Sequence, residues 1–216
     1  MDECLVRRTK MKRGAVFYGV VILILAATTV WAEDLNPPPW QRYQDRTTYQ
    51  RWEFTTSANP VGPDVQSNSE GPVSFELTGE FPYTAWMQSS NGASGVWKFE
   101  DYLKITIANF PEGAPYYKEI WMQFTYSAEA GLDPIVFTTP TATSIVLVGK
   151  ELIQDPWWLI TFKIRIDPNP SSEVIWVQPR ACTGYIDELV IDTICIPEPA
   201  TILLLGLGGL ALLRKR

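Results

Sequence analysis

Alternating apolar and polar residues are the feature that most constrains the fold of this chain. In residues 157–167, Trp158 and Ile160 fall on one face of an extended backbone and Leu159 falls on the other. The stretch 119–126 alternates in the same way. A period of two is typical of a β-strand, whose successive side chains point to opposite faces. Both stretches are therefore predicted to be strands.

Short strands are predicted along most of the chain. Glycine- and proline-rich segments such as Asn59–Asp64 separate them, and no helical period is sustained outside the two hydrophobic ends. This pattern predicts an all-β fold, an antiparallel jelly-roll-like sandwich of about eight to eleven strands. The absence of an internal repeat argues against a propeller or a β-helix. The further predicted strands are 49–55, 73–77, 85–88, 96–99, 103–108, 135–138, 144–148, 174–178 and 185–191.

The N-terminus has the order of a secretory signal. A basic segment precedes the apolar run 15–27, and Val30 and Ala32 have the spacing of a small-residue cleavage site. Residues 1–32 are therefore predicted to be a signal peptide, with an uncleaved membrane anchor as the alternative. Translation starts at the first methionine or at Met11, because the signal is complete without the first ten residues.

The C-terminus ends in a second hydrophobic segment. Residues 200–213 carry no charge, and as a helix they would be about 21 Å long, short of the ~30 Å hydrocarbon core of a bilayer. A helix of this length spans only marginally, and a buried core helix is the alternative. Three basic residues follow and favour the cytoplasmic side, which places the middle of the chain outside. They are Arg214, Lys215 and Arg216.

Between these ends lie a leader and one domain. Residues 33–48 contain three consecutive prolines and are predicted to be an extended leader, and residues 49–195 form the predicted sandwich. Residues 33–196 hold ten Lys or Arg and twenty-one Asp or Glu, a net charge of −11. So acidic a surface repels phosphate backbones, and no nucleic-acid partner is expected.

Catalytic motifs are scarce. The chain has no histidine, which excludes Ser-His-Asp and Cys-His mechanisms and the commonest zinc and copper sites. Glu100 and Asp101 are adjacent and would point to opposite faces of a strand; Asp187 and Glu188 form a second cluster, with Asp192 near. No catalytic residue or cofactor is predicted, except that loop carboxylates could hold a stabilising calcium ion. An extracellular carbohydrate-active enzyme using two carboxylates is the alternative.

Two tryptophans are candidates for a carbohydrate contact. Trp121 and Trp157 alternate outward, and an exposed indole on a sandwich face can stack on a sugar ring. Core packing is the alternative for any tryptophan here.

Two cysteines lie in the exported region. If residues 183–194 form one extended strand, Cys182 and Cys195 lie about 43 Å apart, far beyond the reach of a disulfide. A bridge between them requires a sharp turn in that segment, and the sequence leaves both states open.

The tail 196–216 resembles the PEP-CTERM sorting signal of Gram-negative bacteria. The resemblance rests on Pro197, Glu198 and Pro199, followed by the glycine-containing apolar run and the terminal basic cluster. A similar tail closes some proteins named as ice-binding, but the regular threonine arrays of an ice-binding face are absent. The stretches 37–54 and 185–199 resemble an uncharacterised group of exported sandwich proteins.

The resemblance implies a route and a partner. An exosortase, an integral-membrane transpeptidase, would recognise Pro197–Pro199, cut near them and pass the protein to the cell surface or an exopolysaccharide matrix. The chain is accordingly interpreted as a non-catalytic exported protein, tethered to the inner membrane by its C-terminal helix and able to bind polysaccharide. A single-pass membrane protein that is never cleaved is a further alternative.

Overall fold

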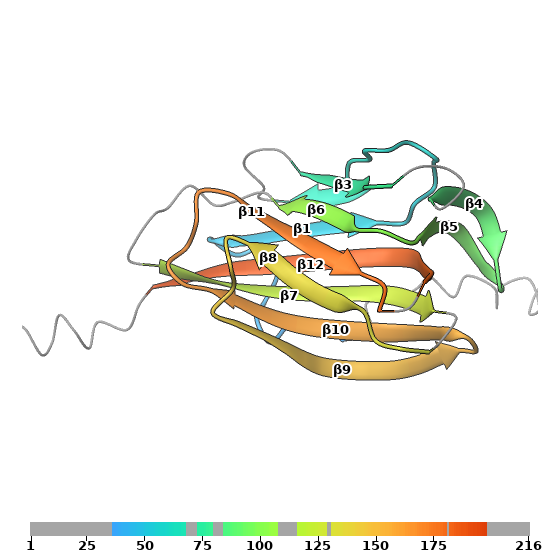
Figure 1. The fold of residues 1–216 in the computed structure, drawn as a ribbon. Helices are drawn as coiled ribbons and strands as arrows, with labels where there is room; N and C mark the ends of the chain where they lie inside the picture. Colours follow the sequence, from blue (N-terminus) through green and yellow to red (C-terminus); the bar gives the residue numbers. More distant parts are fainter. Residues whose placement is uncertain are drawn as a thin grey trace, which may run out of the picture. The chain divides into compact units, whose positions relative to one another are not determined.

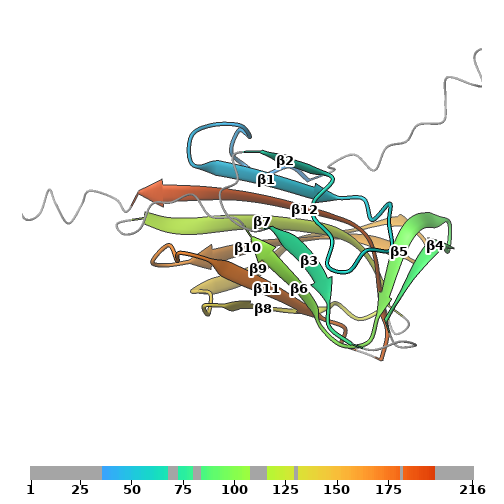
Figure 2. The same cartoon turned by 90° about the horizontal axis from the view of Figure 1, so that it is seen from above.

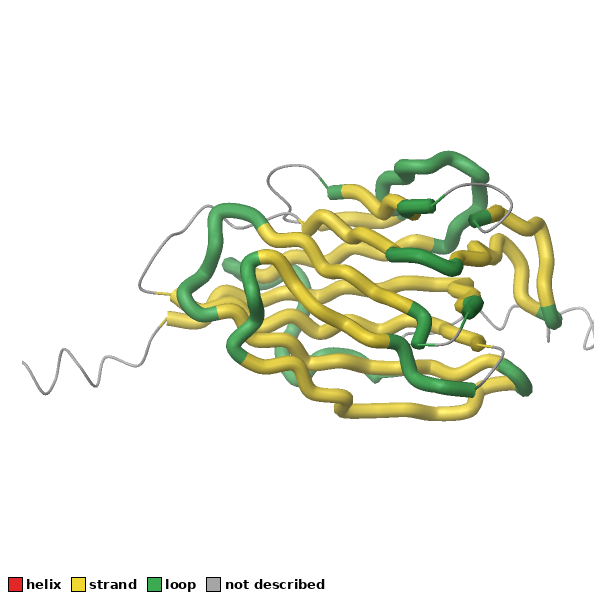
Figure 3. Tube along the Cα trace, viewed as in Figure 1, coloured by secondary structure: helices red, strands yellow, loops and turns green. Residues whose placement is uncertain are grey.

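The computed structural model describes residues 36–67, 73–79, 84–107, 116–128, 131–180 and 182–197. This part of the chain contains twelve strands and no helix (Figure 3). The strands are β1 (Thr47–Trp52), β2 (Val65–Ser67), β3 (Ser74–Leu77), β4 (Ala85–Ser90), β5 (Ala93–Phe99), β6 (Leu103–Ile107), β7 (Tyr116–Ala128), β8 (Ile135–Thr139), β9 (Ser144–Gln154), β10 (Trp157–Ile166), β11 (Glu173–Gln178) and β12 (Gly184–Pro197).

The strands form two sheets. Sheet A has eight strands, six of them in the order β2-β1-β12-β7-β10-β9, with the β4–β5 hairpin joined to β12 through β5. Sheet B has four strands in the order β3-β6-β11-β8. The sheets form two layers, with sheet B over one face of sheet A (Figures 1 and 2). All pairings between the named strands are antiparallel, which confirms the predicted all-β, antiparallel fold.

Strand β12 runs through the middle of sheet A. It pairs with β7 from Gly184 to Pro197, and on its other edge with β5 and then with β1. A bulge at Asp187, where the register against β7 shifts, lies between the part of β12 that pairs with β5 and the part that pairs with β1. The strand is longer than the predicted segment 185–191, and its last paired residue is Pro197.

The core lies between the two sheets. The inward faces of β7 and β10 carry the predicted alternating residues, among them Ile120, Phe124 and Ile160, which are almost fully buried. One ion pair crosses this core, because the Lys118 ammonium on β7 donates to the Glu173 carboxylate on β11 and neither side chain is exposed. Charges removed from water must be paired, so this contact links the two sheets in a fixed position.

Several finer predictions need correction, and others concern residues that the structure does not describe. The strand predicted at 144–148 continues to Gln154, and β2 was not predicted. The strand order does not identify a jelly roll, and that assignment stays a prediction. The signal segment 1–32 and the helix at about 200–213 lie outside the described residues. Within the described ranges, no helix is long and apolar enough to cross a membrane.

Cys182 and Cys195 are not joined by a disulfide. Cys182 is exposed and precedes β12, whereas Cys195 is buried near the other end of the same strand. The segment between them is one extended strand with a single bulge, so the geometric objection to a disulfide applies.

Candidate functional site

The end of β12 is where the fold meets the predicted sorting motif. Ile196 is paired with Tyr117, and Pro197 with Tyr116, in the last two rungs of the ladder with β7. Pro197 is exposed and is the last residue described; the other motif residues, Glu198 and Pro199, and the basic residues Arg214, Lys215 and Arg216 lie outside the described part. The folded domain therefore reaches the motif without an intervening linker.

Aromatic and basic side chains surround this strand end. The Arg46 guanidinium lies 4.7 Å from the centroid of the Tyr116 ring, and the Arg165 guanidinium lies 3.7 Å from that of Tyr117. Arg46 is fixed in place because its carbonyl accepts a hydrogen bond of 3.0 Å from the Cys195 amide. These two pairs lie on opposite faces of sheet A, at the end where β12 stops, because Tyr116 and Tyr117 are successive residues of β7. We call Arg46, Tyr116, Tyr117 and Arg165 the tail-end surface.

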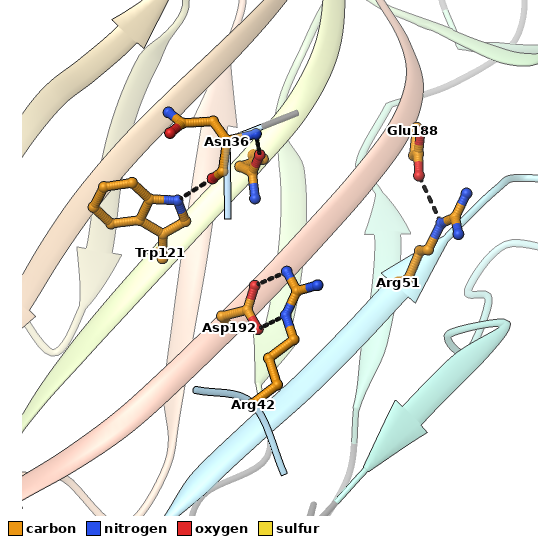
Figure 4. Close-up of polar contacts among 7 residues, drawn as sticks. Asn36, Arg42, Arg51, Trp121, Glu188 and Asp192 are labelled. Atoms are coloured by element: carbon orange, nitrogen blue, oxygen red, sulfur yellow. Dashed lines mark hydrogen bonds and ion pairs between the residues drawn. The ribbon is translucent and has the colours of Figure 1, made fainter. Parts of the chain in front are cut away.

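An N-terminal strap, residues 36–46, covers the outer face of sheet A. Asn36 bonds to three positions on β7 and β10: its amide donates to Gln123 Oε1 (3.1 Å), its side chain donates to Thr161 Oγ1 (3.0 Å), and its carbonyl accepts from Trp121 Nε1 (2.7 Å; Figure 4). A Cβ at Gly149 would come within 2.9 Å of the Asn36 side chain, so a glycine on β9 leaves room for the strap. The predicted Pro-rich leader therefore packs on the domain.

The strap is also fastened by charge. Arg42 donates from Nε and from Nη2 to the two oxygens of Asp192, each at 2.5 Å (Figure 4). The Asp192 side chain is fully buried in β12, and the guanidinium also lies 4.4 Å from the centroid of the Tyr49 ring. Two parallel hydrogen bonds match the guanidinium fork to a carboxylate. Asp192, one of the acids considered as a chemical candidate, thus has a structural partner.

The acids beside the β12 bulge are electrostatically unusual. Arg51 donates from Nε to Glu188 at 2.6 Å and also contacts Glu53 at 3.0 Å. Burial raises the pKa of Glu188 to about 7, because desolvation of the charged form outweighs the attraction of Arg51. Burial alone raises the pKa of Asp187 to about 6. Such values are found in general acids, but Glu188 is bound to a cation on the adjacent strand.

Neither candidate stacking tryptophan is an open platform. Trp121 does point outward, but it is half-buried, because the strap carbonyl of Asn36 binds its indole and Trp40 packs edge-on at 6.3 Å. Trp157 is only 2% exposed, and its Nε1 donates to the Asn91 carbonyl at 3.1 Å in the β4–β5 turn. The expected exposure of Trp157 is therefore wrong. Alternation assigns a residue to a face, but other segments decide whether that face is open.

No cluster suited to a metal is found in the described part of the chain. There, no group of three or more Cys, Asp or Glu side chains converges on one point. Glu100 lies 3.3 Å from Lys98 and accepts a hydrogen bond from Thr183 at 3.3 Å. The calcium hypothesis stays a prediction, for which the chain offers no ligand set among these residues.

Comparison with known proteins identifies the tail. A family model described as the PEP-CTERM protein-sorting motif matches residues 196–216. The chain carries a PEP-CTERM sorting motif. The motif begins at Ile196, one residue before β12 ends, and indicates an exported protein that passes through a membrane-associated sorting intermediate with an exosortase as its processing partner. No curated protein and no solved structure matches the chain.

Sequence reasoning missed the strap contacts and the tail-end surface. Arg42 and Asp192 are 150 residues apart, and no local pattern relates them. The composition of the leader does indicate that it packs on the domain. Trp40 and Arg42, close to three prolines, are large side chains that a solvated linker does not need.

Proposed function

We propose that this PEP-CTERM protein is a non-catalytic protein of the cell surface or extracellular matrix. Its tail would hold it in the inner membrane until an exosortase-type transpeptidase cuts near Pro197–Pro199 and releases it outward. The observation that carries the proposal is the direct continuation of β12 into the motif. Pro197 is the last residue of the ladder with β7, and a proline has no amide proton with which to extend it.

Processing can be tested with a matched pair of variants. Glu198→Ala removes the charge of the motif, whereas Glu151→Ala removes an exposed charge from β9. We expect the first variant to keep its full mass through Arg216 and to stay in the membrane fraction, and the second to be shortened like the native protein. A native protein that ends in Arg216 on every molecule would refute the processing step.

The acids of β12 support a non-catalytic role. Arg42 binds Asp192 and Arg51 binds Glu188. These two carboxylates of β12 therefore tie the strand to the strap and to β1. A glycosidase requires a pair of acids about 5–10 Å apart on either side of a substrate cleft. A carbohydrate-active enzyme remains the alternative, and Glu188→Gln would then abolish hydrolysis of a polysaccharide that the native protein degrades.

A group of aromatic side chains favours carbohydrate binding as a second role. On the outer face of sheet B, the Trp176 and Phe137 rings are stacked with an interplanar angle of 11°, and Tyr102 meets both edge-on. Phe137 is 38% exposed, and the register places Lys104 beside Trp176, with Glu76 as its ion-pair partner at 2.9 Å. Aromatic faces beside paired polar groups suit an uncharged sugar polymer.

Retention on an insoluble polysaccharide tests this second role. We expect Trp176→Ala to lose retention, because it removes an indole from the partly exposed aromatic group. Trp121→Ala serves as the control, because its ring lies under the strap. Equal retention of the two variants, or no retention of the native protein, would contradict carbohydrate binding through sheet B.

A further inference from the structure

The distance between the domain and the membrane is set by the end of β12. Pro197 is held by the ladder with β7, and only three residue steps separate it from Ala200, where the uncharged run begins. Fully extended, three steps reach about 11 Å. The polar head-group layer of a bilayer is roughly 5–8 Å thick on each side. If the run is anchored as the proposed function requires, the end of sheet A lies at the head groups.

The side chains at this end suit that environment. Tyr116 and Tyr117 are half-buried, and tyrosine is enriched at membrane interfaces because its ring is apolar and its hydroxyl is polar. A guanidinium forms paired hydrogen bonds to phosphate and tolerates contact with an aromatic face. The tail-end surface supplies two such pairs. One is Arg46, just before β1, with Tyr116 on β7, and the other is Arg165 on β10 with Tyr117 on β7.

The distribution of charge also favours membrane contact at this end of the domain. The exported region has a net charge of −11, which an anionic bilayer repels. At the tail-end surface a cation lies near each of the described acids. Arg165 donates to Asp167 at 2.8 Å, Lys163 lies 3.0 Å from Glu119, and the exposed Asp45 precedes Arg46 in the sequence. This end can therefore approach phosphate groups without the repulsion that the rest of the acidic surface would meet.

We propose that the tail-end surface, formed by Arg46, Tyr116, Tyr117 and Arg165, rests on phospholipid head groups while the tail is anchored. The domain then does not swing freely above the membrane, and the sorting motif is held at the depth where an integral-membrane protease works. This inference depends on the membrane anchoring in the proposed function, so the experiment must separate the two.

The experiment compares the membrane depth of spin labels placed near the two ends of β12. The full chain is reconstituted into vesicles of phosphatidylcholine and phosphatidylglycerol, with Cys4 replaced by serine. A nitroxide is attached either to Asp45→Cys in a Cys182→Ser background or to the native Cys182, which lies about 40 Å away at the other end of β12. Collisions of each label with a water-soluble nickel chelate and with lipid-soluble oxygen then report its depth.

We expect the label at position 45 to collide with nickel several-fold less often than the label at Cys182. The double variant Arg46→Ser/Tyr117→Ser should raise that collision rate toward the Cys182 value, whereas Tyr185→Ser, at the far end of β12, should not. The depth of the label in the otherwise native chain tests the inference even where the double variant fails to fold.

Two other results are informative in different ways. Vesicles that carry the protein while both labels are equally accessible to nickel would overturn the head-group contact and leave the anchor intact. A protein that does not float with the vesicles would overturn the anchor, and the head-group contact with it.

Discussion

Replacing Arg42 by alanine tests whether the strap is a part of the fold. The change removes two hydrogen bonds of 2.5 Å from Asp192, whose side chain is fully buried, and a guanidinium 4.4 Å from the Tyr49 ring centroid. Removal of one partner of a buried ion pair costs about 3–5 kcal/mol. The Arg42 side chain is itself 20% exposed, which lets water reach the truncated site, so we expect the lower end, about 3 kcal/mol.

The assay is unfolding by urea and by heat, followed by tryptophan fluorescence. A loss of about 3 kcal/mol corresponds to a fall in Tm of roughly 6–12 °C for a protein of this size. Lys104→Ala is the matched control, because its ion pair with Glu76 lies on the surface and should contribute less than about 1 kcal/mol. If Arg42→Ala lost no more stability than Lys104→Ala, the reasoning that the strap is fastened to β12 would be refuted.

Three further results are expected. Trp157→Ala should lower the free energy of unfolding by about 3–5 kcal/mol, since the indole is buried; a loss below about 1 kcal/mol in urea unfolding would contradict this. The Glu188 carboxyl keeps its proton to about pH 7 in the folded protein but releases it near pH 4 when unfolded, so its contribution to stability falls as the pH rises between these values. Unfolding measured across this range should show a flatter profile for Glu188→Gln than for the native protein, and parallel profiles would count against the raised pKa. Cys182 should react with a thiol reagent in the folded protein and Cys195 only after unfolding; equal rates would contradict the buried position of Cys195.

Strand identity could be read from the sequence because a period of two is a local property. The alternation through Trp158 and Ile160 predicts the inward face of β10 correctly. Strand ends were harder to predict. The last predicted strand ends at Ile191, but β12 continues to Pro197, and a cation from the strap accommodates Asp192 in mid-strand.

The exposure of residues on the outer face of sheet A could not be predicted, because the segments that cover this face are distant in the sequence. The outward direction of Trp121 and Trp157 follows from alternation, whereas the strap and the β4–β5 turn that cover them come from residues 66 to 85 positions away. For the candidate site, the sorting motif was recognisable from contiguous residues. The tail-end surface was not, because Arg46 meets Tyr116, and Arg165 meets Tyr117, only through the strand order.

The central position of β12 determines how the domain would carry a mechanical load. If the tail is joined to a matrix, as the proposed function implies, a pull on Pro197 acts along β12, which is bonded to β7 on one edge and to β1 and β5 on the other. Hydrogen bonds in an antiparallel ladder are perpendicular to the strands, so such a pull shears many bonds together. An edge strand pulled sideways would open one rung at a time. The attachment point is thus on the strand best placed to resist extraction.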